Sequence, residues 1–194
     1  MTETKIICHG DSLTEGYGIP HRLRWSDLLA QNSAADFINT GISGDTTAGM
    51  LARFYPMVIA QNPTHVIITG GTNDVSVHLP QRDIIANLLT MVRQARHFDI
   101  IPILGIPPPF IFAFDAVEKS EIFLEPQLFF KELKVLQKNV ALIAEEKDVD
   151  VIDFSNGMVA ELFLEDGLHP NEIGQQMMAM NALVTLKEVI PNVF

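Results

Sequence analysis

The chain has 194 residues, of which 47% are hydrophobic and 19% are charged, and this composition excludes a disordered or fibrous protein. Its 13 basic residues against 24 acidic ones give a net charge of -11, so neither a nucleic acid nor an anionic membrane is expected to bind. The one cysteine, Cys8, cannot form a disulfide within the chain.

The organisation of the chain predicts one domain over residues 1–194, because no repeat, low-complexity tract or linker interrupts it. No signal peptide is visible at the start, which favours a cytoplasmic protein and leaves open a leader that has been removed. The most apolar stretch, residues 100–114, is broken by prolines and too short to cross a bilayer, so stable membrane anchoring is not expected. A homo-oligomer is left open.

Five short runs have the apolar and β-branched character of buried parallel strands. They cover residues 5–10, 36–41, 65–71, 100–105 and 148–154. Helical patterns alternate with them, two short ones at residues 25–31 and 46–55 and three with longer apolar faces. These faces are formed by Ile84, Leu88, Val92 and Ala95, by Leu133, Leu136, Val140 and Ile143, and by Ile173, Met177, Met180 and Val184. The alternation predicts an α/β fold with a doubly wound parallel sheet.

Polar motifs follow four of these strands. They are GDSLT at 10–14, GISGDTT at 41–47, GGTND at 70–74 and, after a longer loop, EDGLHP at 165–170. The carboxyl ends of parallel strands share one edge of a sheet, and ligands of such folds bind there. We therefore expect the four motifs to meet and to form the functional site.

Ser12 is the candidate nucleophile at this edge, with His169 as its base and Asp166 as the partner of the base. A serine hydroxyl needs a neutral imidazole to accept its proton, and the imidazole needs an acceptor on its other nitrogen. A spacing of three residues lets one tight loop supply both Asp166 and His169. The simpler interpretation is that Ser12 caps a helix, Asp166 starts a turn and His169 lies on the surface.

Gly44 and Asn73 are candidates for an oxyanion hole, together with the backbone N–H of Ser12. Acyl transfer places negative charge on the former carbonyl oxygen, and fixed N–H donors must meet that charge. Both motifs also have simpler interpretations. Asn73 would close an Asx-turn after its strand, and Asp45 or Thr46 would cap the next helix.

In their order along the chain, GDSLT, the glycine of NTGISGDTT, GTND and DGLHP resemble the sequence blocks of the GDSL, or SGNH-hydrolase, superfamily. The resemblance extends from residue 5 to about residue 175. Residues 39–54 look most like the bacterial arylesterase, thioesterase I and lysophospholipase branch. The resemblance implies a flavodoxin-like, three-layer α/β/α sandwich with a five-stranded parallel sheet.

The resemblance also implies roles for individual residues. Ser12, His169 and Asp166 would form the catalytic triad, and the oxyanion hole would consist of Ser12, Gly44 and Asn73. We therefore expect a serine acyl hydrolase that cleaves small-molecule carboxylic esters or thioesters through an acyl-enzyme, with no cofactor and no metal. A carbohydrate O-deacetylase with the same triad and a non-catalytic, anion-binding module of flavodoxin-like fold are the alternatives.

Three further residues are candidates for contact with substrate. They are His78, in the loop after Asn73, and Phe110 and Phe112, in a long connection at residues 106–126. Long connections of this kind are usually functional or interfacial. We interpret this one as core folded over the sheet or as a flap that lines an acyl pocket, in preference to a dimer surface. The remaining histidines lack the spacing of metal ligands.

Overall fold

The computed structural model describes residues 4–111 and 126–194. Its strands are β1 (Lys5–Gly10), β2 (Asp36–Asn39), β3 (His65–Thr69), β4 (Ile101–Ile106) and β5 (Asp150–Asp153). They form one sheet in the order β2-β1-β3-β4-β5, and every neighbouring pair is parallel. The predicted five-stranded parallel sheet is confirmed, and its strand order is that of flavodoxin-like folds.

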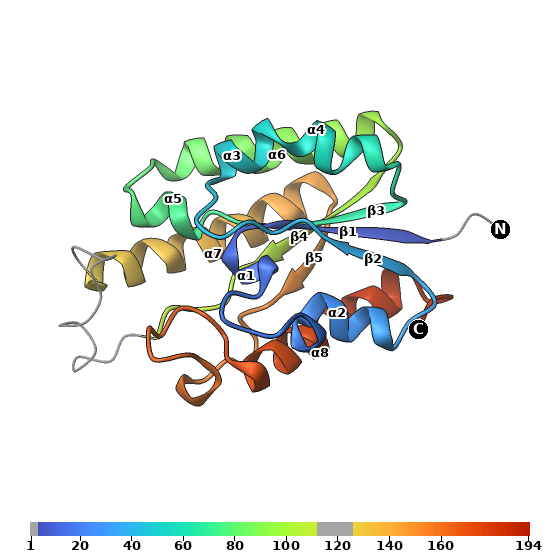
Figure 1. The fold of residues 1–194 in the computed structure, drawn as a ribbon. Helices are drawn as coiled ribbons and strands as arrows, with labels where there is room; N and C mark the ends of the chain where they lie inside the picture. The colour runs from blue at the N-terminus through green and yellow to red at the C-terminus, as the bar shows by residue number, and fades with distance from the viewer. Residues whose placement is uncertain (1–3, 112–125) are drawn as a thin grey trace.

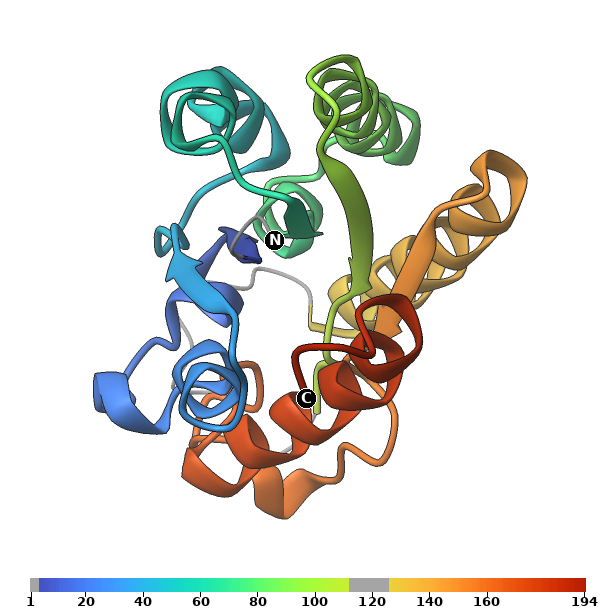
Figure 2. The same cartoon turned by 90° about the vertical axis from the view of Figure 1, so that its right-hand side faces the viewer.

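Helices cover both faces of the sheet and give the molecule three layers (Figure 1). One face carries α3 (Thr47–Ala52), α4 (Phe54–Met57), α6 (Gln81–His97) and α7 (Pro126–Lys147), and the other carries α2 (Trp25–Gln31) and α8 (Glu172–Val189). Figure 2 shows the two groups on opposite sides. Short helices α1 (Ser12–Glu15) and α5 (Thr72–Ser76) follow β1 and β3, and 3-10 turns lie at His21–Leu23, Ile59–Gln61 and Ala160–Leu162. No helix in the described part of the chain is long and apolar enough to cross a membrane.

Successive residues of each strand enter two different cores. In β1, Ile7 packs into the core that lies under α6 and α7, whereas Ile6 and Cys8 pack into the core under α2 and α8. All three side chains are fully buried. Because both faces of the sheet are covered, its strands are continuously apolar, and this property makes them recognisable in the sequence.

Several predicted elements have different bounds in the structure. β3 ends at Thr69 instead of residue 71, β4 is shifted by one residue to Ile101–Ile106, and β5 is shortened to Asp150–Asp153. β2 ends at Asn39, two residues early, because the Asn39 side chain turns the chain by accepting a hydrogen bond from the Gly41 N–H at 2.9 Å. The helix predicted at residues 46–55 is two helices, α3 and α4, separated at Arg53. Thr46 caps α3, as one of the simpler interpretations holds, by accepting a hydrogen bond from Gly49.

The apolar faces predicted for α6 and α7 are buried, but the face predicted for α8 is wrong. Three of its four residues, Ile173, Met180 and Val184, are 60%, 61% and 67% exposed. The buried side of α8 is instead formed by Gly174, Gln175, Met178, Ala179, Ala182 and Leu186. A Cβ at Gly174 would lie 2.2 Å from the Leu162 carbonyl oxygen, so small residues let this side approach its neighbours closely. Since α8 is apolar on two sides, periodicity alone cannot select the buried one.

Candidate active site

Ser12 lies at the carboxyl end of β1, as the first residue of the one-turn helix α1. The fully buried Asp11 caps this helix by accepting a hydrogen bond from the Leu13 N–H at 2.9 Å. Gly10 is needed at the end of the strand, because a Cβ there would lie 2.1 Å from Thr14 Oγ1. Ser12 therefore sits on a tight, well-anchored turn and is 7% exposed.

His169 links Ser12 to Asp166. Its Nε2 lies 2.9 Å from Ser12 Oγ, and its Nδ1 lies 2.6 Å from Asp166 Oδ2. The other carboxylate oxygen of Asp166 accepts hydrogen bonds from the N–H groups of Leu168 and His169. Burial by itself raises the pKa of Asp166, but hydrogen bonds from the His169 ring and from the two backbone groups outweigh it, so the pKa lies below its usual value. Asp166 is thus an ionised acceptor aimed at the imidazole.

The loop at residues 165–170, which carries Asp166 and His169, is anchored on both sides. Gly167 has a φ of 65°, and a Cβ there would lie 2.2 Å from the Ile111 carbonyl oxygen, so a larger residue does not fit. Directly after the loop, Asn171 caps α8 and donates a hydrogen bond from its amide to the Glu161 carbonyl oxygen at 2.8 Å. These contacts keep the loop over the end of β1.

The motif after β2 forms a turn in which the Asp45 N–H donates to the Ile42 carbonyl oxygen at 3.2 Å. Gly44 occupies the third position of this turn with a φ of 79°, which glycine adopts without strain. Asn73 lies in α5, and its Nδ2 donates to the Asp45 carbonyl oxygen at 2.9 Å. The structure thus places Asn73 against the turn that carries Gly44. The second N–H of the Asn73 amide is not used by that bond.

Tyr17 contacts the site and is not singled out by the sequence. Its ring lies against the His169 ring, with centroids 4.5 Å apart and planes tilted by 39°. About half of Tyr17 is exposed. The one available signal is its position in the glycine-rich loop, five residues after Ser12.

Two buried carboxyl groups, Asp11 and Asp74, lie under the site. From the sequence, Asp11 is expected either to fix the loop by a side-chain to backbone hydrogen bond or to touch substrate, and the structure shows that hydrogen bond. Burial raises the pKa of Asp11 to about 7, although the hydrogen bond from Leu13 opposes the shift. Asp74 is buried as well, and burial raises its pKa. Its two carboxylate oxygens accept hydrogen bonds from the Thr47 N–H and hydroxyl at 2.8 and 2.5 Å, which joins α5 to the start of α3. Acidic residues after strands look alike in a sequence whether they are buried or exposed.

Of the three candidates for substrate contact, the structure describes His78 and Phe110. His78 is exposed just after α5, with a φ of 60°. Phe110 is buried in the core, where its ring meets the Phe129 ring of α7 edge-on at 5.0 Å. Phe112 and most of the 106–126 connection lie outside the described residues, so the flap and dimer interpretations remain predictions.

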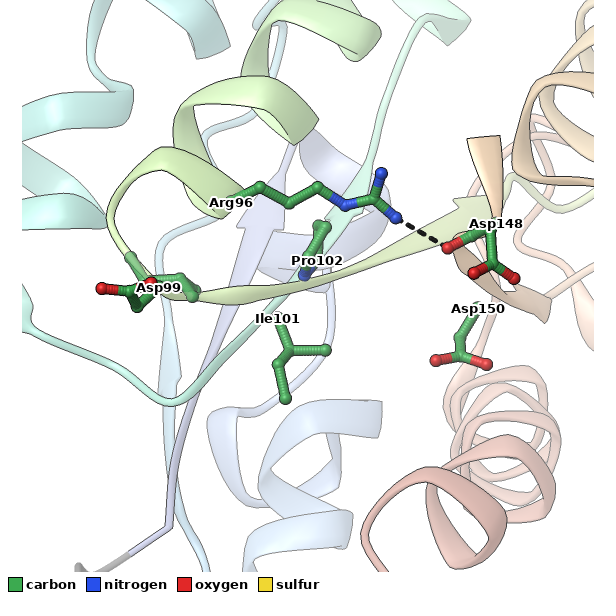
Figure 3. A pocket seen from close by; sticks show the side chains of 7 residues that line it. Arg96, Asp99, Ile101, Pro102, Asp148 and Asp150 are labelled. Atoms are coloured by element: carbon green, nitrogen blue, oxygen red, sulfur yellow. Dashed lines mark hydrogen bonds between the residues drawn. The ribbon is translucent and has the colours of Figure 1, made fainter. Parts of the chain in front are cut away.

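A second group of polar side chains lies at the opposite edge of the sheet, around a cavity of about 280 Å³ (Figure 3). Its lining consists of Arg96, Asp99, Ile100, Ile101, Pro102, Asp148 and Asp150. Arg96 reaches toward β5, and its Nη2 donates to the Asp148 carbonyl oxygen at 2.6 Å. The arginine and the aspartates are exposed. None of the predicted site residues in the described part of the chain lines this cavity.

The sequence matches a model of the GDSL-like lipase/acylhydrolase family over residues 8–177. It is 27% identical to an arylesterase of Vibrio mimicus over 188 residues, which cover 90% of this chain and 84% of the relative. It is 28% identical to the esterase TesA of Pseudomonas aeruginosa, over 95% of this chain and 89% of the relative.

Solved structures show the same similarity. A lipolytic protein of the G-D-S-L family from Desulfitobacterium hafniense superposes with a TM-score of 0.79 at 26% identity, covering 95% of this chain and all of that one. A solved structure of TesA gives a TM-score of 0.75 at 26% identity, covering 96% of this chain and all of that one.

Proposed function

Since the chain belongs to the GDSL-like lipase/acylhydrolase family and is a carboxylic ester hydrolase, we propose that it works through Ser12, His169 and Asp166. The observation that carries the proposal is the line of contacts from Ser12 Oγ to His169 at 2.9 Å and from His169 to Asp166 at 2.6 Å. An ionised carboxylate only accepts hydrogen bonds, so His169 Nδ1 carries the ring hydrogen. The lone pair of Nε2 is then directed at the serine hydroxyl.

The reaction follows from this arrangement in two halves. Ser12 Oγ attacks the carbonyl carbon while His169 Nε2 takes the hydroxyl proton, and Asp166 stabilises the imidazolium. The tetrahedral intermediate collapses, His169 returns the proton to the leaving alcohol or thiol, and the acyl group stays on Ser12. His169 then deprotonates a water molecule, which attacks the carbonyl carbon of the acyl-enzyme. The bond between this carbon and Ser12 Oγ breaks, His169 returns the proton to Ser12 Oγ, and the acid is released.

The negative charge of both tetrahedral intermediates needs fixed donors. We assign this role to the backbone N–H groups of Ser12 and Gly44 and to the Asn73 amide. The hydrogen bond from Asn73 to the Asp45 carbonyl oxygen supports the assignment, because it ties two of these donors together. The loss of one such donor costs about a hundredfold to a thousandfold in turnover.

The substrate we propose is a small carboxylic ester or thioester. The similarity to an arylesterase and to TesA supports the ester. A thioester carbonyl reacts by the same steps and releases a better leaving group. The proposed reaction therefore applies to thioesters as well as to esters.

The test is hydrolysis of p-nitrophenyl acetate, p-nitrophenyl octanoate and an octanoyl thioester by the wild type and by Ser12→Ala. Ser33→Ala, between α2 and β2 and away from the site, is the matched control. We expect Ser12→Ala to lose activity by about three orders of magnitude or more and Ser33→Ala to keep it.

A fluorophosphonate probe gives an independent readout, because it labels an activated serine without a substrate of the right shape. Labelling of the wild type and of Ser33→Ala, but not of Ser12→Ala, is expected. Equal hydrolysis by Ser12→Ala would show that another group is the nucleophile. Absence of both labelling and hydrolysis in the wild type would favour the anion-binding module.

A further inference from the structure

The turn at Ile42–Asp45, here called the Gly44 turn, has few contacts of its own at the tip. Gly44 is exposed, and a Cβ built on it would meet no atom of the described residues within 4 Å. The start of the turn is held by Glu15 of α1, whose carboxylate accepts hydrogen bonds from the Ser43 N–H and hydroxyl. The direction of the Gly44 N–H is therefore set by the residues on either side of it.

Asp45 fixes the other end of the turn. Its Oδ2 accepts a hydrogen bond from Arg53 Nε at 2.6 Å, and each of the two side chains is only 14% exposed. Its carbonyl oxygen accepts the hydrogen bond from Asn73. Gly49 leaves the space for this carboxylate, because a Cβ there would lie 1.8 Å from Asp45 Oδ1. Both the side chain and the backbone of Asp45 are thus held.

The other nitrogens of the Arg53 guanidinium bind backbone at the ends of two strands. Nη1 donates to the Thr40 carbonyl oxygen at 2.6 Å, directly after β2, and Nη2 donates to the Gly10 carbonyl oxygen at 2.8 Å. Gly10 is the last residue of β1, two residues before Ser12. One planar group therefore joins the strand that carries the serine to the Gly44 turn.

Asp45 is the charged partner of Arg53. His9 is buried beside it, with Nδ1 at 3.4 Å from Arg53 Nη1 and Nε2 at 3.0 Å from the Met50 carbonyl oxygen. Burial, followed by the charge of Arg53, lowers the pKa of His9 to about 4. His9 is consequently neutral at pH 7 and adds no second positive charge.

We propose that Arg53 is a positioning residue, which fixes the Gly44 N–H relative to the Ser12 hydroxyl and so shapes the oxyanion hole. The proposal rests on the function proposed above. Oxyanion donors are effective because they point, before the reaction starts, at the place where charge develops. The fork of a guanidinium can hold two carbonyl oxygens and a carboxylate in one fixed arrangement, which the single ammonium of lysine cannot do. Arg53 acts through Gly44 and touches no reacting atom.

The experiment compares Arg53→Met and Arg53→Lys with Arg96→Met. Arg96 is the matched control, because it also donates to a backbone carbonyl oxygen but does so at the other edge of the sheet. The measurements are kcat and KM for p-nitrophenyl octanoate, and the inhibition constant of an alkylboronic acid, which forms a tetrahedral adduct with the serine.

For Arg53→Met we expect kcat to fall about a hundredfold, which is the loss that a misplacement of about 1 Å produces. The inhibition constant is expected to rise by the same factor, while KM changes less than about threefold. Arg53→Lys is expected to lie between this variant and the wild type. Arg96→Met should match the wild type in all three constants.

A purely structural role gives a different pattern. If Arg53 only stabilised the fold, kcat would fall with the number of folded molecules, while KM and the inhibition constant of the remaining enzyme would stay unchanged. That pattern, or an unchanged kcat, overturns the proposal. Asp45→Asn, which keeps an acceptor for Arg53 and removes the charge, is the milder variant if Arg53→Met does not fold, and the same paired shift of kcat and inhibition constant is expected of it.

Ser12→Ala separates this proposal from the proposed function. Loss of activity in Ser12→Ala with normal constants in the Arg53 variants removes only the positioning role. Full activity in Ser12→Ala removes the triad and the positioning role with it.

Discussion

The two ends of the central sheet carry similar groups of charged side chains. Beneath the candidate site lie Arg53, Asp11, Asp45 and Asp74. Around the cavity at the other edge lie Arg96, Asp99, Asp148 and Asp150. The arginine at the candidate site holds a carboxylate and two backbone carbonyl oxygens, whereas Arg96 holds one carbonyl oxygen.

Burial is the main difference between the two groups. Asp11 and Asp74 are fully buried, and burial raises the pKa of both carboxyl groups. Asp11 also interacts electrostatically with His169 and Asp74. Asp148 and Asp150 are exposed, and charges in water are screened from one another. In a chain with 24 acidic residues, an acidic group alone therefore says little about function. Burial and shared hydrogen bonds identify the group that is coupled to Ser12.

We expect the largest difference in kcat between the two ends of the sheet for a matched pair of conservative substitutions, Asp166→Asn and Asp150→Asn. Asparagine at position 166 would offer an amide in place of the carboxylate, so the ring hydrogen of His169 would no longer be held on Nδ1. We expect kcat to fall by about a thousandfold to ten-thousandfold. Asp150→Asn changes the same chemical group in an exposed position and should leave kcat unchanged. Similar losses in the two variants would mean that charge in general, and not the His169 contact, supports activity.

Asp11→Asn is expected to change how stability depends on pH. Asp11 keeps its proton up to about pH 7 in the folded state, but loses it near pH 3.8 when unfolded. Between these values the folded state binds more protons than the unfolded state, so the free energy of unfolding falls as the pH rises from about 4 to about 7. The amide in the variant does not titrate. The free energy of unfolding of the variant, relative to the wild type, should therefore rise across this interval, by up to about 4 kcal/mol.

Urea unfolding at several pH values between 4 and 8 measures this difference. His9 acts in the opposite direction, because its pKa is lowered from 6.5 to about 4 and its contribution to stability is lost as the pH falls through that range. Both proteins contain His9, so subtracting the wild-type curve isolates Asp11. A parallel curve for Asp11→Asn would show that Asp11 is already charged at acidic pH in the folded protein.

The sequence predicts the sheet well and one helix face badly, for the same physical reason. Buried parallel strands are apolar on both sides, so Ile6, Ile7 and Cys8 mark β1 whichever side each of them faces. A helix must expose one side, and α8 has apolar residues on both. There, Gly174 and its small neighbours determine which side fits, and only the shape of the neighbouring Leu162 loop shows this.

The residues of the candidate site also differ in how well the sequence predicts them. Ser12, Gly44, Asn73 and His169 follow strands or lie in short motifs, so the topology of a parallel sheet is enough to bring their segments to one edge. Arg53 lies between two short helices, and its partners come from β1, β2 and the Gly44 turn. These contacts of Arg53 depend on how three separate segments are oriented in the folded protein. A local sequence pattern carries no information about that.

Aromatic contacts offer the smallest test of the same comparison. The Tyr17 ring lies against the His169 ring at the candidate site. At the other edge of the sheet, the Tyr55 ring meets the ring of Phe98 edge-on, with centroids 5.9 Å apart, and Phe98 is two residues after Arg96. An aromatic neighbour orients the imidazole, and its face favours the imidazolium that forms during the reaction. Such a contact is worth about 0.5–1.5 kcal/mol, so Tyr17→Ala should lower kcat about twofold to tenfold.

Two variants show whether this loss comes from the ring of Tyr17. Tyr17→Phe keeps the ring and should keep kcat. Tyr55→Ala removes a tyrosine of similar exposure from the other aromatic pair and should also keep kcat. A loss in Tyr17→Phe as large as that in Tyr17→Ala would assign the effect to the hydroxyl group. A loss in Tyr55→Ala would mean that exposed aromatic residues act through general stability. If kcat is kept in both Tyr17→Phe and Tyr55→Ala, the Tyr17 ring contributes to turnover and the Tyr55 ring does not. The reason is that only Tyr17 contacts a group whose charge changes during the reaction, the His169 ring.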